Sequence, residues 1–304
     1  TLAQVAVTDL AGFNNALKWT TTEPESTIDG NETLDICQKI EAQHCQRLGY
    51  GLSGAKSSTL SSYVKSSVTG TYGINIYKAD STTRIFNKTY TIDSANTWEK
   101  KTVTFIGDTD SSATIDNDNG QGFYVNWHLF AGTDYTDTTS TSGWVNYSTG
   151  TWANGHGTNA VGTTASATWQ LADCQLEVGE QATPFEQRSF GEELALCKRY
   201  FRRWDSTTSS FNNICIGYTL GATKGRGVVH YPVEMRASPT VEHSGTFRVY
   251  DGTASRSVSD VEFQRVSTRE VYLNFVTSGA TTNRPSEMGA NDDTSCTIDF
   301  LAEL

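Results

Sequence analysis

The run Phe123-Tyr124-Val125-Asn126-Trp127-His128-Leu129-Phe130 alternates large apolar residues with polar or mixed ones. A period of two residues is typical of a β-strand with one buried face, because successive side chains point to opposite sides of a sheet. The residues expected to face a core are Phe123, Val125, Trp127 and Leu129. Those expected to share the other face are Tyr124, Asn126 and His128.

Similar alternation recurs on both sides of this run. Tyr72, Ile74 and Ile76 form another apolar row, and further strands are expected over residues 15–21, 59–66, 84–92, 101–106 and 167–178. Turn signals such as Asp118-Asn119-Gly120 separate them. Parallel sheets need helical crossovers, and residues 33–47 offer at most one short helix, which could equally be an edge strand. The pattern therefore predicts an antiparallel β-sandwich.

One segment has a helical pattern instead. Ser189 and Glu192 have capping-box spacing, acidic residues fill the first turn and basic residues fill the last two. Apolar residues recur at Leu194, Cys197 and Phe201. We expect a helix over residues 189–203, within a linker of residues 186–203.

After Trp204 the strand pattern returns. Strands are expected over residues 214–220, 226–232, 246–250, 259–266, 270–276 and 294–302. Asp251-Gly252 is a hairpin signal, and Gly221–Gly227 lacks the Gly-Lys-Ser/Thr ending of a phosphate-binding loop, so it too is expected to be a hairpin loop. The chain is thus predicted to be mainly β, with one β-sandwich over residues 1–185 and a second over residues 204–304.

Composition narrows the classes of function. The 304 residues carry a net charge of −11 and contain no apolar run long enough to span a membrane. No basic stretch followed by an apolar core opens the chain, so no secretory signal is expected. The excess of acidic groups argues against a nucleic-acid partner, because the phosphate backbone attracts basic faces.

The cysteines and histidines show no metal-binding spacing. The cysteines are Cys37, Cys45, Cys174, Cys197, Cys215 and Cys296, and none forms a C-x-x-C pair. We interpret them as buried free thiols. If the protein were exported, Cys37 and Cys45 would be the pair to suspect of forming a disulfide.

Several runs resemble one family of proteins. They include Gln175-Leu176-Glu177-Val178-Gly179-Glu180 continuing to Cys197-Lys198-Arg199-Tyr200, Asn96-Thr97-Trp98-Glu99-Lys100, and Tyr231-Pro232-Val233-Glu234-Met235-Arg236-Ala237-Ser238-Pro239-Thr240. These runs resemble a module of bacteriophage virion proteins, usually tail fibres and related appendages. The resemblance covers nearly the whole chain. It implies a carbohydrate-binding-module-like jelly roll over residues 1–185, joined by the linker helix to a C-terminal β-domain.

The resemblance also implies a setting. Such a protein is expected to be part of the virion, assembled in the bacterial host cytoplasm, to form a homotrimer, and to contact other virion proteins. Asn14–Trp19 resembles an early strand of the module, so a segment that docks on the particle is expected to precede this chain. Apolar residues on more than one side of the linker helix would suit a three-fold contact.

Two places have the composition of a glycan site, which combines aromatic rings with polar side chains. The first is the mixed face with Tyr124, Asn126 and His128, which could instead be a packed or solvated sheet face. The second is the loop-rich stretch Gly143–Gly162, with Trp144, Tyr147 and Trp152, whose rings could instead close the end of the sandwich. We predict host-surface polysaccharide as the ligand of these six residues.

No constellation of residues indicates catalysis. Acids such as Asp108, Asp110, Asp116 and Asp118 lie in turn-rich stretches, where accepting backbone hydrogen bonds explains them. No catalytic residue, metal or cofactor is assigned, although by analogy with sugar-binding jelly rolls Asp173 is a candidate ligand for a structural calcium. The expected function is host-glycan recognition without catalysis. The alternatives are a head or tail decoration protein without sugar binding and, third, a glycan depolymerase.

Overall fold

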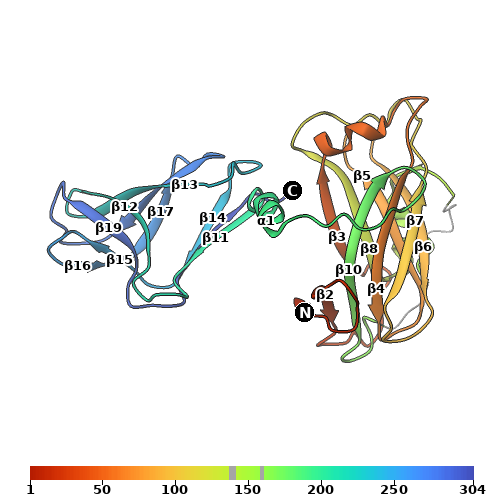
Figure 1. Cartoon of the computed structure of the whole chain (residues 1–304), viewed down its shortest axis with the longest axis horizontal. Helices are drawn as coiled ribbons and strands as arrows, with labels where there is room; N and C mark the ends of the chain where they lie inside the picture. Colours follow the sequence, from red (N-terminus) through yellow and green to blue (C-terminus); the bar gives the residue numbers. More distant parts are fainter. Residues whose placement is uncertain (137–141, 158–160) are drawn as a thin grey trace. The chain divides into compact units, whose positions relative to one another are not determined.

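The computed structural model describes residues 1–136, 142–157 and 161–304. It is mainly β, as predicted, and divides into two compact units, Thr1–Gln187 and Arg188–Leu304 (Figure 1). Within the described residues, no helix is long and apolar enough to cross a membrane.

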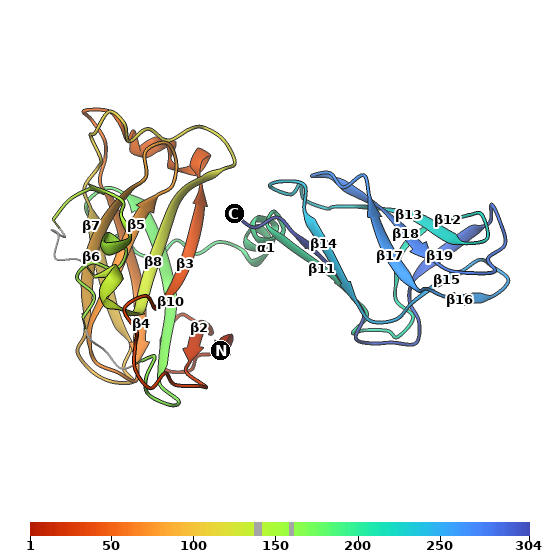
Figure 2. The same ribbon diagram turned by 180° about the vertical axis from the view of Figure 1, so that it is seen from behind.

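The N-terminal unit is a jelly-roll sandwich of two antiparallel five-stranded sheets. The first sheet has the order β1 (Leu2–Ala6), β2 (Asn15–Thr20), β10 (Thr168–Val178), β4 (Ser58–Ser66) and β7 (Glu99–Phe105). The second has the order β3 (Thr33–Glu41), β8 (Gln121–Ala131), β5 (Gly70–Lys78), β6 (Arg84–Ile92) and β9 (Val145–Asn146). Figure 1 shows β10 beside β4, and Figure 2 shows β3 beside β8. Short 3-10 helices cover Ala42–Leu48, Thr133–Tyr135 and Thr149–Thr151.

The apolar rows found by alternation form the core between these sheets. The core residues of β8 are at most 2% exposed, and they pack with the row that includes Tyr72, Ile74 and Ile76. Residues 33–47 contain both a strand and a short helix, the two structures between which the sequence left the choice open. Strand β3 takes the first part, and a 3-10 helix over Ala42–Leu48 takes the second.

The C-terminal unit is a β-sandwich with one short helix, α1 (Phe190–Lys198). Its smaller sheet has the order β11 (Phe201–Asp205), β20 (Thr297–Leu301) and β14 (Thr240–Ser244). Its larger sheet has the order β16 (Ser255–Ser257), β15 (Phe247–Tyr250), β19 (Pro285–Ala290), β12 (Asn213–Leu220), β13 (Lys224–His230), β18 (Glu270–Val276) and β17 (Asp260–Gln264). The expected hairpin at Asp251-Gly252 joins β15 to β16.

Helix α1 begins as predicted but ends earlier. The Ser189 hydroxyl accepts the Glu192 amide at 3.3 Å, and the Glu192 carboxylate accepts the Ser189 amide at 3.1 Å. The predicted helix over 189–203 is wrong beyond Lys198, because Phe201–Asp205 pairs with β20 as a strand. That pairing places Trp204 against the core of the unit, which a continued helix would not do.

The cysteine interpretation is half right. Cys45, Cys215 and Cys296 are buried free thiols, whereas Cys37, Cys174 and Cys197 are exposed. The exposed ones lie at outward positions of β3, β10 and α1, which the spacing of cysteines along the chain could not reveal. Cys37 and Cys45 are both free.

Candidate functional site

The outer face of the second sheet of the N-terminal unit carries three rows of aligned side chains. In the first row, Lys39 of β3 lies opposite Tyr124 of β8, which lies opposite Tyr77 of β5. The second row is Cys37, Asn126, Asn75 and Asn87, and the third pairs Asp35 with His128 beside Gly73. Cross-strand register therefore brings together residues that are far apart in the sequence.

A segment of residues 147–157, the strap, crosses this face. A capping box between Ser148 and Thr151 shapes its 3-10 turn. Backbone hydrogen bonds hold its two ends, from Tyr147 N–H to the carbonyl of Thr83 just before β6 (3.1 Å) and from Gly157 N–H to the carbonyl of Thr71 in β5 (3.1 Å).

Side chains of the second row hold the middle of the strap. The Asn87 amide donates to the Thr151 carbonyl at 2.8 Å, and the Asn75 amide donates to the Trp152 carbonyl at 2.5 Å. A neighbouring tie comes from the sheet backbone, where Gly73 N–H donates to His156 Nδ1 at 2.9 Å. Because sheet groups bond directly to it, the strap is part of the face and not a separate loop.

Packing of the strap onto the sheet gathers four rings, which we name the aromatic patch: Tyr77, Tyr124, Tyr147 and Trp152. The Tyr77 ring centroid lies 5.3 Å from that of Tyr124, 5.1 Å from that of Tyr147 and 5.6 Å from that of Trp152. Tyr147 is 37% exposed and the other three are half-buried. Residues from the two predicted glycan sites thus belong to one surface.

Next to the patch lies a polar network of Asp35, Asn75, Asn126 and His128, in which the two asparagines and the histidine are fully buried and Asp35 is half-buried. His128 Nδ1 bonds to one Asp35 carboxylate oxygen, and Trp152 Nε1 donates to the other at 2.8 Å. The Asn75 amide nitrogen lies 2.9 Å from His128 Nε2, and its oxygen accepts from Asn126 at 2.7 Å. Asn126 and His128 are fully buried, so a ligand on the patch meets the rings first.

The contacts fix the tautomer of His128. A carbonyl oxygen can only accept, so the atom of Asn75 that faces the Trp152 carbonyl must be the amide nitrogen. That nitrogen also faces His128 Nε2, which must therefore accept and carry no proton. The proton is on Nδ1, where it is donated to Asp35.

Asp35 and His156 both have pKa values below their ordinary ones. Burial alone would raise the pKa of the Asp35 carboxyl, but hydrogen bonds from His128 and Trp152 outweigh burial and hold the pKa below its usual value. Burial is the main cause that lowers the pKa of His156 to about 4. At neutral pH His156 is therefore uncharged, as an acceptor of the Gly73 amide must be.

Trp144, the sixth predicted residue, lies apart from the patch. Its Nε1 donates to the Ile106 carbonyl at 2.6 Å, and its ring packs on Tyr50 and Phe86 at the end of the sandwich core. It also lines a pocket beside the ion pair of Arg84 and Asp108. For Trp144 the structure matches the alternative of a ring that closes the sandwich.

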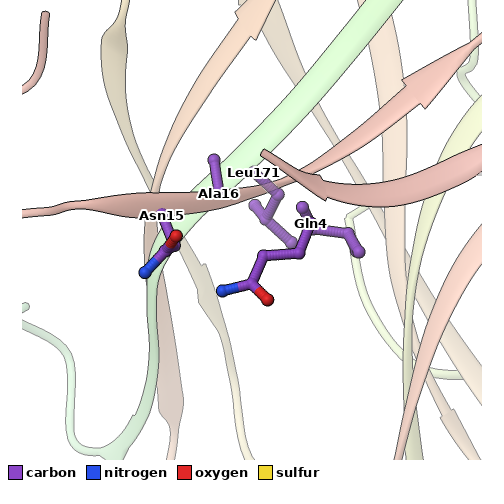
Figure 3. A pocket seen from close by; sticks show the side chains of 5 residues that line it. Gln4, Asn15, Ala16 and Leu171 are labelled. Carbon is purple, nitrogen blue, oxygen red and sulfur yellow. The ribbon is translucent and has the colours of Figure 1, made fainter. Parts of the chain in front are cut away.

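Two further places on the N-terminal unit lie apart from the aromatic patch. A shallow pocket against the β1–β2 hairpin is lined by Gln4, Asn15, Ala16, Leu17 and Leu171, and Figure 3 shows the Gln4 and Asn15 amides on the same side of it. Asp173 sits in a bulge of β10 with a φ of 53°, and burial raises its pKa. Over the described residues, no group of three or more His, Cys, Asp or Glu side chains could hold a metal ion.

Sequence reasoning missed Asp35, Asn75 and Tyr77. Asn75 and Tyr77 occupy the mixed face of the strand whose core face was recognised, so the alternation that placed Tyr124 could have placed them. Asp35 lies in a segment whose strand and helix interpretations were both open, and only the register with His128 brings it to the site.

No protein-family model matches the chain, and no curated protein matches its sequence. Among solved structures, the chain is similar to a CBM4 structure at 14% identity, covering 54% of this chain and 70% of that chain with a TM-score of 0.30. It is similar to a family 16 carbohydrate-binding module at 13% identity, covering 58% and 84% with a TM-score of 0.28. Similarity to discoidin II from Dictyostelium discoideum is 12% identity, covering 94% and 82% with a TM-score of 0.20. The residues of the site, and not these likenesses, carry the functional argument.

Proposed function

We propose that the aromatic patch binds a host-surface polysaccharide without catalysis. The observation that supports this is the gathering of four partly exposed rings above a buried polar network. Sugars present apolar C–H faces that pack on aromatic rings, and hydroxyl groups that suit tyrosine hydroxyls at the rim. Lys39, whose ammonium lies 5.1 Å from the Tyr124 ring centroid, adds a polar group at the border.

The proposal gives Asp35, the one carboxylate of the polar network, no catalytic role. Both of its oxygens are engaged, by His128 and by Trp152. A glycosidase acid or base must instead be able to exchange a proton with the substrate or with water. We therefore favour recognition over a depolymerase.

The proposed setting is a bacteriophage virion, with this chain in a tail fibre or a related appendage. The sequence runs around Gln175–Tyr200 and Tyr231–Thr240 support this setting. Binding through several weak patches on one particle would give avidity, which suits a modest single site.

The test of glycan recognition is binding of the whole chain to an array of bacterial surface polysaccharides. The variant Tyr147→Ala/Trp152→Ala should lose binding, because it removes half of the aromatic patch. Phe211→Ala is the matched control, since Phe211 is a 48%-exposed ring in the C-terminal unit. Absence of any bound polysaccharide, or full binding by a double variant with unchanged circular dichroism, would contradict the proposal.

We also propose that α1 joins copies of the chain as a parallel homotrimer. Phe190 is 82% exposed, Leu194 is 38% exposed, and exposed Cys197 continues the same stripe at i, i+4 and i+7. Glu193 and Lys198 flank the stripe five residues apart, which is the spacing of ion pairs between parallel helices of a coiled coil.

Sedimentation of the whole chain tests this arrangement. We expect a trimer for the native chain and a monomer for Leu194→Glu, with Ile216→Glu as a control at an apolar surface residue outside α1. A native monomer at micromolar concentration, or an unchanged trimer in Leu194→Glu, would rule out the α1 contact.

A second candidate function is that of a decoration protein that only contacts other virion proteins. Exposed apolar residues on β12 favour it, since Ile216 is 75% exposed and Tyr218 is 45% exposed. Host-cell binding by the purified chain distinguishes the two candidates, because a decoration protein would not bind cells.

A further inference from the structure

We infer that Asp35 and Asn75 are positioning residues that fix Trp152 in its binding orientation, with His128 as the link between them. This inference rests on the proposed function for its consequence, but its structural part can be tested without any glycan. It assigns a role to two residues outside the aromatic patch, of which Asn75 is fully buried and Asp35 has a side chain that is 14% exposed.

Trp152 is held by the network through its indole N–H and through its main-chain carbonyl. Asp35 accepts the indole N–H at 2.8 Å, which fixes the plane of the ring. Asn75 donates to the main-chain carbonyl at 2.5 Å, which fixes the backbone from which the ring projects. A strand-to-strap contact at one point would leave the ring free to rotate about its side-chain bonds, whereas two contacts do not.

His128 couples the two holders. It donates from Nδ1 to Asp35 and accepts at Nε2 from Asn75, so each holder is itself fixed by the same imidazole. Thr33 adds a hydrogen bond to the Asp35 carboxylate at 3.2 Å. These hydrogen bonds run in one direction, from Asn126 to Asn75, from Asn75 to His128 and from His128 to the Asp35 carboxylate.

The chemistry of Asp35 makes the inference specific. Two N–H donors, from His128 and Trp152, face its two oxygens. In Asp35→Asn the side chain keeps its shape but offers one oxygen and one N–H group. One of the two donors must then lose its partner, and Trp152 has the freedom to turn away because His128 is fully buried.

Indole N–H signals measured by NMR on tryptophan-labelled whole chain test the structural part. Trp152→Phe identifies the Trp152 signal among those of the seven tryptophans. We expect Asp35→Asn to move this signal upfield and to speed its exchange with water. Asp9→Asn is the matched control, because Asp9 accepts the Trp98 indole N–H at 2.9 Å on the exposed surface, so it should change the Trp98 signal alone.

The native chain offers a measurement that does not depend on a variant folding. The Trp152 indole N–H should exchange more slowly than the exposed Trp98 indole N–H. Equal exchange rates, or an unmoved Trp152 signal in folded Asp35→Asn, would overturn the inference.

Binding measurements separate this inference from the proposed function. With a polysaccharide that the array identifies, Asp35→Asn should bind about tenfold more weakly, as expected for one lost charge-assisted hydrogen bond. If Tyr147→Ala/Trp152→Ala abolishes binding while Asp35→Asn binds as the native chain does, the positioning role fails and the proposed function stands. If neither variant changes binding, the proposed function fails, and the NMR result alone decides the structural part.

Discussion

The outer face of the second sheet of the N-terminal unit and that of the seven-stranded sheet of the C-terminal unit differ in how their large side chains are supported. On the N-terminal unit, the rings of the aromatic patch rest on buried Asn and His side chains and are tied down by the strap. On the C-terminal unit, β12 points Ile216, Tyr218 and Leu220 outward, with exposures of 75%, 45% and 40%. Arg226 lies opposite Tyr218, and Glu287 lies opposite Ile216.

The difference separates two kinds of surface. Polar groups buried under rings are costly unless every donor has an acceptor, so such a network fixes one arrangement of the rings. Apolar side chains on an uncovered sheet face need no such support, and they can pack against partners of different shapes. The first suits a ligand recognised by orientation, and the second suits a protein surface.

The largest expected effect comes from breaking the polar network. Asn75→Leu should destabilise the N-terminal unit by about 4 kcal/mol, because it strands His128 Nε2, the Trp152 carbonyl and the Asn126 amide in a buried site. Urea unfolding of the whole chain, followed for the transition of each unit, measures the loss. The unfolding transition of the C-terminal unit should not move. A loss below 1 kcal/mol in the unfolding free energy of the N-terminal unit would show that the polar network does not act cooperatively.

Acid should weaken the tie between strap and sheet. The pKa of His156 is about 4 in the folded chain and near 6.5 when unfolded, so the unfolded chain takes up the proton first. Above pH 6.5 His156 therefore does not lower the free energy of unfolding. As the pH drops from 6.5 toward 4, that free energy falls by about 3 kcal/mol in total. The measurement is the pH dependence of the N-terminal transition in the native chain minus that in His156→Gln, which can still accept the Gly73 amide.

In this subtraction the other acidic groups cancel, since they are common to both proteins. Equal pH dependence of the native and His156→Gln chains would show that His156 is not kept neutral by the fold.

A smaller effect is expected at Gly73, where the sheet lies close to the strap. A Cβ built on Gly73 would lie 3.1 Å from His128 Cδ2 and 3.1 Å from His156 Cβ, so in Gly73→Ala the imidazole of His128 and the strap at His156 must each yield by a few tenths of an ångström. We expect a loss of about 1–2 kcal/mol in the N-terminal transition, as for a modestly overpacked core. Gly54→Ala is the control, because nothing lies within 4 Å of its Cβ position. Equal stability of the two variants would show that the strap can move away from the added methyl group at no cost in free energy.

The fold could be predicted from sequence where burial gives a strong period of two. Strand β8 could be predicted because every second side chain is large, apolar and buried in the core. Strand β1 was not, because its side chains are nearly all exposed, and β19 was not, because Gly289 lies where a Cβ would meet the Asn212 carbonyl and so breaks the pattern.

The candidate site was predicted only in part, for a similar reason. Tyr124, Tyr147 and Trp152 were named from composition and alternation. Their meeting depends on cross-strand register and on the hydrogen bonds from Asn75 and Asn87 to the strap, which local sequence does not encode. The same holds for Trp144, whose ring turns into the core end because Ile106 offers it a carbonyl.

The smallest expected effect is on the open face of the C-terminal unit. Ile216→Thr keeps the β-branched shape and removes apolar surface that is 75% exposed, so stability of this unit should change by less than about 0.5 kcal/mol. The C-terminal transition in urea, recorded at two protein concentrations, measures it. A loss above 1 kcal/mol that grows with concentration would mean that another copy already covers Ile216, and the contrast between a supported and an open face would then fail. A small and concentration-independent change keeps that face available for a partner other than the chain itself.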